Sequence, residues 1–211
     1  MKRQELIDAA LLHYSLHGYQ GATMKKIAIE VGIKPASIYF FYKNKEELFI
    51  AAFQQLLENH FAEMKRILAK TSSQSVDQIF SEMLHGIVKY HKNDERGTMA
   101  YISLVTSPIP EIKLYLQKHM LHFNDWLVRS LEDLLRQSYS SISDDEMDRI
   151  IKQFALLANG VFWGINLYEG QDFEEQVHLA DTFISSLFRD VEMKYGLSTV
   201  QKGGNRYGEK I

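Results

Sequence analysis

The chain has 211 residues, of which 45% are hydrophobic, so it can bury a substantial core and we expect a folded protein. It contains no cysteine, which excludes disulfides and thiolate metal sites and fits a reducing compartment. The net charge of −3 is unusual for a protein that binds nucleic acid, but charge acts locally. The first 48 residues carry a net +2 and the rest −5, so only the N-terminal segment is suited to phosphate contact.

The chain begins MKRQE and then becomes amphipathic, without the apolar region of an export signal. No apolar stretch approaches the length of a membrane span, so we expect a cytoplasmic protein without a membrane partner. The glycines near the C-terminus follow a helix rather than a strand, which argues against a phosphate-binding loop. We therefore expect no cofactor.

Apolar spacing predicts an all-α fold. Leu6, Ala10 and Tyr14 recur every four residues up to Gly18, where a first helix should end, and Thr23 can cap a second. Longer helices are predicted at 45–69, 75–92, 95–105, 110–138, 145–169 and 173–195. Asn44 to Glu47 is typical of a capping box, and residues 196–211 are expected to form a flexible tail.

Residues 23–45, TMKKIAIEVGIKPASIYFFYKNK, contain the most informative pattern. A helix-turn-helix needs a small residue where its helices cross, a permissive turn residue and flanking apolar anchors. Ala28, Gly32, Ile33 and Ile38 fit these roles, and Pro35 can start the third helix. An ordinary helical hairpin with a solvated basic rim is the alternative interpretation.

The third helix would present small, hydroxyl and basic side chains outward. Small residues let the backbone approach base edges, Ser37 can read them, and nearby lysines and tyrosines can reach phosphates. The predicted DNA-binding residues are Thr23, Lys25, Lys26, Lys34, Ala36, Ser37, Tyr39, Phe40, Tyr42, Lys43 and Lys45.

The run from Leu6 to Phe49, including HGYQGATMKKIAIEVGIKPASIYFFYKNKEELF, resembles the DNA-binding domain of the TetR/AcrR family of bacterial regulators. The resemblance implies that the third helix reads bases and that Thr23, Tyr39 and Lys45 contact phosphates. It also implies an N-terminal three-helix DNA-binding domain at 1–48 and a larger helical domain at 49–195, which binds an effector and dimerises.

In the family the last two helices pair with their copies across a two-fold axis. We therefore expect a homodimer, although packing within the chain is an alternative because an apolar stripe does not identify its partner. The predicted interface residues are Phe154, Leu157, Val161, Gly164, Ile165, Ala180, Ile184, Leu187, Phe188 and Val191.

The family's effector pocket lies among the helices of the larger domain, and an apolar or aromatic effector is expected. Ordinary core packing is the alternative role for each candidate. The candidates are Met83, His85, Tyr90, Tyr101, Phe123, Trp126, Asn159, Phe162 and Trp163.

His119 and His122 could share a helix face, but no thiols or matched carboxylates complete a metal site. No motif selects a catalytic triad either, so we do not expect an enzyme. The sequence predicts a DNA-binding regulator, in our hypothesis a repressor that an effector releases from a palindromic operator. An activator or ligand-independent regulator is the first alternative, and a helical enzyme or interaction module is the second.

Overall fold

The computed structural model describes residues 2–104 and 109–196, so the predicted tail lies almost entirely outside the described residues. The described residues form α-helices and one short 3-10 helix and contain no strand, which confirms the predicted fold class. The helices are α1 (Lys2–Gly21), α2 (Met24–Glu30), η1 (Pro35–Phe40), α3 (Lys45–Thr71), α4 (Val76–Asn93), α5 (Glu95–Leu104), α6 (Pro110–Ser138), α7 (Asp144–Leu167) and α8 (Gly170–Tyr195).

Local signals set many helix ends. The Thr23 side chain accepts a hydrogen bond from the Lys26 amide at 3.3 Å, which confirms it as the cap of α2. Asn44 caps α3 by accepting from the Glu47 amide at 2.7 Å. The expected reciprocal bond differs, because the Glu47 carboxylate accepts from the amide of Lys43 rather than from that of Asn44.

Gly18 interrupts α1 as expected: its φ of +63° is non-helical, so a first helical segment ends there, and a second, short one continues to Gly21. One prediction near the N-terminus needs correction. The third helix is a 3-10 helix of six residues, which begins at Pro35 as expected. Its turns are tighter than those of an α-helix, which changes the directions in which its side chains point.

The N-terminal core joins α1, α2, η1 and the first half of α3. It is built on fully buried side chains such as Leu6, Ile27, Ile38 and Phe49, and it extends to Ala100 of α5. The second core joins the rest of α3 to α4, α6, α7 and α8, with Phe80 packed against Phe154 and Phe188 at ring distances of 4.8 and 4.9 Å. The predicted boundary after residue 48 falls within α3, which contributes to both cores.

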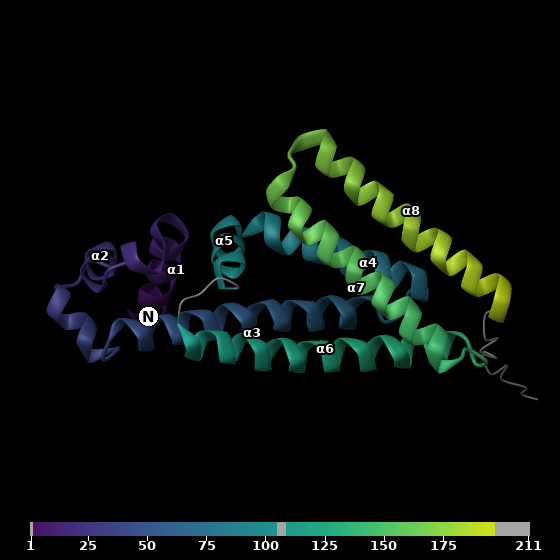
Figure 1. The fold of residues 1–211 in the computed structure, drawn as a ribbon, viewed down its shortest axis with the longest axis horizontal. Coiled ribbons are helices and arrows are strands. Elements are labelled where there is room, and N and C mark those ends of the chain that lie inside the picture. Colours follow the sequence, from purple (N-terminus) through teal and green to yellow (C-terminus); the bar gives the residue numbers. More distant parts are fainter. Residues whose placement is uncertain (1, 105–108, 197–211) are drawn as a thin grey trace, which may run out of the picture.

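Figure 1 shows α3 and α6 side by side, with α4 and α7 packed along one side of them, α8 on the outer side of α4 and α7, and α1 and α2 at one end. Helix α5 lies between these parts and contacts α1. The Tyr14 hydroxyl of α1 donates a hydrogen bond to the Ser103 carbonyl of α5 at 3.2 Å. Because of this hydrogen bond, a movement of α5 would also displace α1.

Helix α7 corrects the expectation about apolar length. By length and composition alone, Asp144–Leu167 could cross a membrane. Its buried residues include Ile150, Phe154 and Val161, which belong to the second core, and its first turn carries three acidic side chains. Core packing accounts for only part of its apolar character, because 33% of its most apolar stretch is buried and Leu156 and Leu167 are exposed.

Candidate DNA-binding surface and ligand cavity

The turn between α2 and η1 has the geometry that a helix-turn-helix requires. Gly32 has φ +71°, which L side chains rarely adopt, so glycine is favoured at this position. The Ile33 amide donates to the Ala28 carbonyl at 2.9 Å, and Ala28 is fully buried where the chain turns back. Ile38 anchors η1 in the N-terminal core.

Most of the residues predicted to contact DNA lie on the surface. Phe40 is 88% exposed and Tyr39 55%, which is unusual for side chains of this size. Ser37 is half-buried. The other exposed members of the set are Thr23, Lys25, Lys26, Lys34, Ala36 and Lys43.

Two predicted DNA contacts are placed differently. Tyr42 is only 4% exposed, so its ring is a core group and the prediction of an exposed contact is wrong. It lies four residues after buried Ile38, on the same side of the chain. The Lys45 ammonium donates to the Tyr19 carbonyl and lies 4.1 Å from the centre of the Tyr19 ring. Partial burial lowers the Lys45 pKa. A phosphate contact would compete with the contacts that the Lys45 ammonium makes to Tyr19.

The first residues of α1 adjoin this surface, which the sequence did not indicate. The Lys2 ammonium donates to the Val31 carbonyl in the turn at 3.2 Å. The Arg3 guanidinium carbon lies 5.3 Å from the centre of the Tyr42 ring. Both side chains are exposed. The Lys2 ammonium is paired with the Glu5 carboxylate at 2.6 Å, so Arg3 contributes more of the positive charge here. Only the packing of α1 against the turn brings them there.

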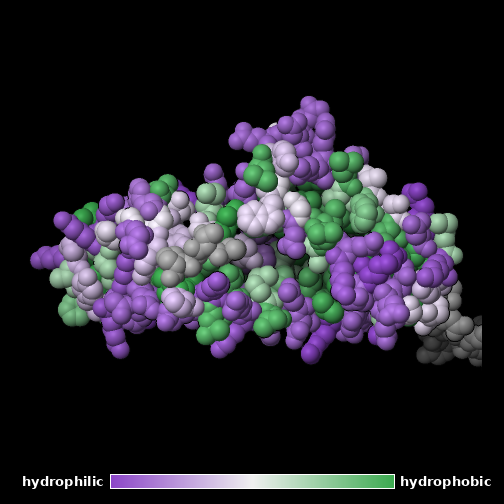
Figure 2. Space-filling model, in the orientation of Figure 1, coloured by the Kyte–Doolittle hydropathy of each residue, from purple (hydrophilic) through white to green (hydrophobic). Residues whose placement is uncertain are grey.

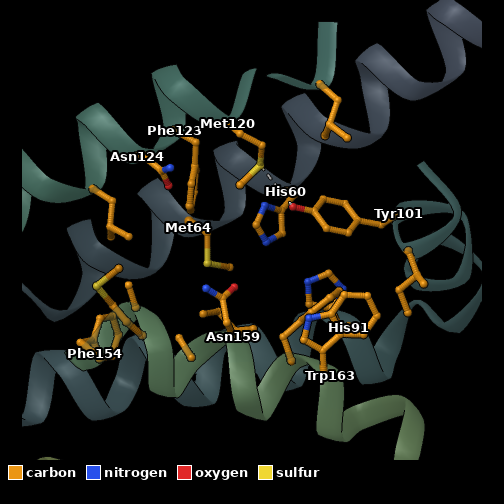
Figure 3. A pocket seen from close by; sticks show the side chains of 18 residues that line it. His60, Met64, His91, Tyr101, Met120, Phe123, Asn124, Phe154, Asn159 and Trp163 are labelled. Atoms are coloured by element: carbon orange, nitrogen blue, oxygen red, sulfur yellow. Dashed lines mark hydrogen bonds between the residues drawn. The ribbon is translucent and has the colours of Figure 1, made fainter. Parts of the chain in front are cut away.

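A cavity of about 320 Å³ lies in the larger helical part, lined by residues of α3 to α7 (Figure 3). Six of the nine predicted pocket residues line it, namely Met83, Tyr101, Phe123, Asn159, Phe162 and Trp163. The volume is at the small end of the range for ligand sites.

The other three candidates do not line the cavity. His85 faces α8, where its Nε2 lies 2.8 Å from the Asp181 carboxylate. Tyr90 packs edge-on against the far side of His60, with ring centres 5.6 Å apart, and Trp126 packs against Phe61 at 5.1 Å. His85 is two residues from Met83, which lines the cavity, so its side chain points to a different side of α4.

Two histidines that were not predicted from the sequence also line the cavity. His60 of α3 and His91 of α4 are buried with ring centres 5.2 Å apart. Burial lowers the pKa of His60 to about 3, and its neighbours His91 and His119 add to the effect. Burial likewise lowers the pKa of His91 to about 4. Both rings are therefore neutral near pH 7. A signal for His60 existed, since it follows Leu56 and Leu57 on the apolar face of its helix.

His119 packs edge-on against Phe61, with ring centres 5.9 Å apart. Over residues 2–104 and 109–196 there is no group of three or more His, Asp or Glu side chains arranged to hold a metal ion.

The stripes predicted to form the dimer interface face the interior of the chain. Eight of the ten residues are buried, seven of them in the second core, and Leu157 and Ile165 pack against it. These residues pack within the chain, which was the alternative interpretation, because α7 and α8 contact each other and α4. A different set of apolar residues is exposed on these helices, namely Leu156, Leu167, Leu179, Phe183 and Met193. Figure 2 shows hydrophobic side chains among polar ones over this part of the molecule.

Comparison with known proteins identifies the family. Residues 6–52 match the sequence model of bacterial regulatory proteins of the tetR family. The negative transcriptional regulator IcaR of the biofilm operon icaADBC in Staphylococcus epidermidis is 30% identical over 132 residues, which cover 60% of this chain and 68% of that protein. The fatty acid metabolism regulator of Bacillus subtilis is 31% identical over 64 residues, 30% of this chain and 33% of that protein.

Solved structures share the fold over most of its length. The regulator FadR from Bacillus subtilis in complex with stearoyl-CoA has a TM-score of 0.67 at 16% identity, covering 87% of this chain and 96% of that one. A regulator from Saccharomonospora viridis in complex with choline has a TM-score of 0.69 at 13% identity, covering 87% and 95%. These likenesses show the fold, while the matched helix-turn-helix and the IcaR relative show that the chain belongs to the TetR family of bacterial transcriptional regulators.

Proposed function

We propose that this regulator is a cytoplasmic, homodimeric repressor that binds a near-palindromic operator and leaves it when a small molecule enters the cavity. The observation that carries the proposal is the exposed face of η1, where Tyr39 and Phe40 stand out from a packed scaffold among lysines. Such large exposed aromatic side chains mark an interaction surface. The relative IcaR is described as a negative regulator, which supports repression rather than activation.

The side chains of this surface divide into two roles. Ser37, Ala36 and Phe40 of η1 would meet base edges in the major groove, where apolar groups contact thymine methyls and hydroxyls pair with bases. Tyr39 and the lysines at positions 25, 26, 34 and 43 would hold phosphates, with Thr23 at the start of α2. We add Arg3 to the phosphate contacts because it is exposed beside η1.

Dimerisation would place two such surfaces on successive major grooves. We move the proposed interface from the buried stripes to the outward residues of α7 and α8, above all Leu156, Leu167, Leu179 and Phe183. An apolar face of this kind gains free energy when a second copy covers it.

Helix α5 supplies a short path from the cavity to the DNA-binding surface. Tyr101 lines the cavity, and two residues later the Ser103 carbonyl accepts the hydrogen bond of Tyr14 in α1. A ligand that displaces Tyr101 would shift α5 and with it α1, which would alter the spacing of the two recognition surfaces.

A mobility-shift experiment tests the proposal. The full chain is mixed with labelled fragments from around its own gene, at several salt concentrations and with unrelated DNA as competitor. We expect a shift that resists unrelated DNA and weakens steeply with salt, because binding releases counterions. A deletion strain should then show raised transcription from the bound fragment. If no genomic fragment is shifted, the proposed function is wrong.

A further inference from the structure

The lining of the cavity carries no formal charge. None of the 18 described residues that line it is Asp, Glu, Lys or Arg. The polar groups are the rings of His60 and His91, the amides of Asn124 and Asn159, the Tyr101 hydroxyl and the Trp163 indole. Asn124, Asn159 and Trp163 are exposed, so the cavity is open on their side. A charged group placed among the buried lining residues, such as His91 and Met83, would lose its hydration without gaining a counter-charge.

The hydrogen bonds around Thr98 determine which nitrogen of His91 carries the proton. The Thr98 Oγ1 lies 3.0 Å from the backbone carbonyl oxygen of His91 and 2.9 Å from its Nδ1. The carbonyl can only accept, so both contacts are hydrogen bonds only when the single hydroxyl proton of Thr98 goes to the carbonyl. Thr98 must then accept from Nδ1–H, which leaves the Nε2 of the neutral ring as a hydrogen-bond acceptor.

This acceptor has no donor. His91 is 2% exposed, and no described residue makes a hydrogen bond to its Nε2. The rings of Phe162, Tyr90, His60 and Tyr101 pack around the His91 ring, with centres 4.7, 5.1, 5.2 and 5.8 Å from its centre. A buried acceptor without a donor costs free energy, which a donor on a bound molecule would recover.

The Tyr101 hydroxyl on the cavity wall is weakly engaged. It donates to the Met120 thioether at 3.7 Å, and a thioether is a poor acceptor. A ligand could therefore displace this ring at little cost in hydrogen bonding.

From this chemistry we propose that the cavity binds an uncharged, mostly apolar molecule whose hydroxyl or N–H group donates a hydrogen bond to Nε2 of His91. The proposal rests on the proposed function in taking the cavity as the effector site. It narrows the effector from apolar molecules in general to those with a donor and no charge.

Three compounds with one ring system test the ligand class, using calorimetric titration of the full chain at pH 7.5. 2-Naphthol has the donor, 2-methoxynaphthalene lacks it, and 2-naphthoate carries a charge. We expect 2-naphthol to bind about 10-fold more tightly than the ether, and the carboxylate to bind most weakly. An ether that binds as tightly as the naphthol would overturn the proposal. So would a carboxylate that binds most tightly, or no measurable binding by any of the three.

Two variants test the role assigned to His91. His91→Phe keeps a ring but removes the acceptor, so the naphthol and the ether should then bind equally. Thr98→Val removes the partner that holds the proton on Nδ1, so the preference for the naphthol should shrink. His178→Gln, an exposed change on α8 outside this cavity, should keep the full 10-fold preference. Folding of each variant is checked by circular dichroism. A preference that survives in folded His91→Phe would refute the assignment.

A mobility shift on the same preparations distinguishes failure of the proposed ligand class from failure of the proposed function. A chain that shifts its DNA fragment but fails the ligand comparison keeps the proposed function and loses the ligand class. A chain that binds the naphthol with the expected preference but shifts no genomic fragment contradicts the proposed function and leaves the ligand class standing.

Discussion

The buried histidines of the cavity should make the stability of the protein depend on pH. His60 and His91 have pKa values of about 3 and about 4 in the fold, against 6.5 in an unfolded chain. Between these values the unfolded chain binds more protons than the folded one, so the free energy of unfolding falls as the pH falls. The stabilisation is complete above pH 6.5 and is lost progressively below it.

The magnitude follows from the two pKa values of each ring. Between pH 7 and pH 5 the unfolded histidine becomes almost fully charged while the folded ring stays neutral, which removes about 2 kcal/mol for each histidine. Tyr90 and Tyr101 beside them do not contribute, because burial raises their pKa further from this range. Two rings together can remove a large part of the stability of a typical domain.

Urea unfolding followed by circular dichroism at pH 7 and pH 5 measures the effect. The double variant His60→Phe with His91→Gln should lose about 4 kcal/mol less than the natural chain over this interval. The control, exposed His178→Gln, should lose as much as the natural chain. If the double variant and the natural chain lose equal amounts, the two rings are not buried as neutral groups and the reasoning fails.

The remaining predictions concern the DNA-binding surface, the turn and the dimer. Tyr39→Phe should weaken binding about 10-fold to operator and unrelated DNA alike in mobility shifts, because a phosphate contact carries no sequence information. Tyr42→Phe should leave both affinities unchanged because the ring is buried, and equal losses for the two variants would contradict the assignment. Gly32→Ala should lower the free energy of unfolding by about 1 kcal/mol, purely through the backbone, because an added Cβ meets no atom within 4 Å. Gly160→Ala, which meets equally open space within α7, should raise it by about 1 kcal/mol, and thermal unfolding that shows the same sign for both would refute this. Phe183→Glu should produce a folded monomer in sedimentation experiments, because the side chain is 45% exposed in one chain; a stable dimer would place the interface elsewhere.

Helix positions followed from the sequence because their signals are local. Pro110 and the polar stretch after Ser138 predicted the bounds of α6 exactly, and the caps at Thr23 and Asn44 form as their side chains indicate. The helix-turn-helix was predictable for the same reason, since a glycine with positive φ and a few apolar anchors define it within about twenty residues.

What each apolar stripe faces was decided only by the tertiary structure. Phe154 and Phe188 looked as suitable for a partner chain as for a core, and the packing of α4 against α7 and α8 placed them inside. His60 and His91 are 31 positions apart, and only the pairing of α3 with α4 brings their rings together and makes them neutral. Periodicity identifies an apolar face but not its partner, because burial is a property of the assembled helices and not of any one of them.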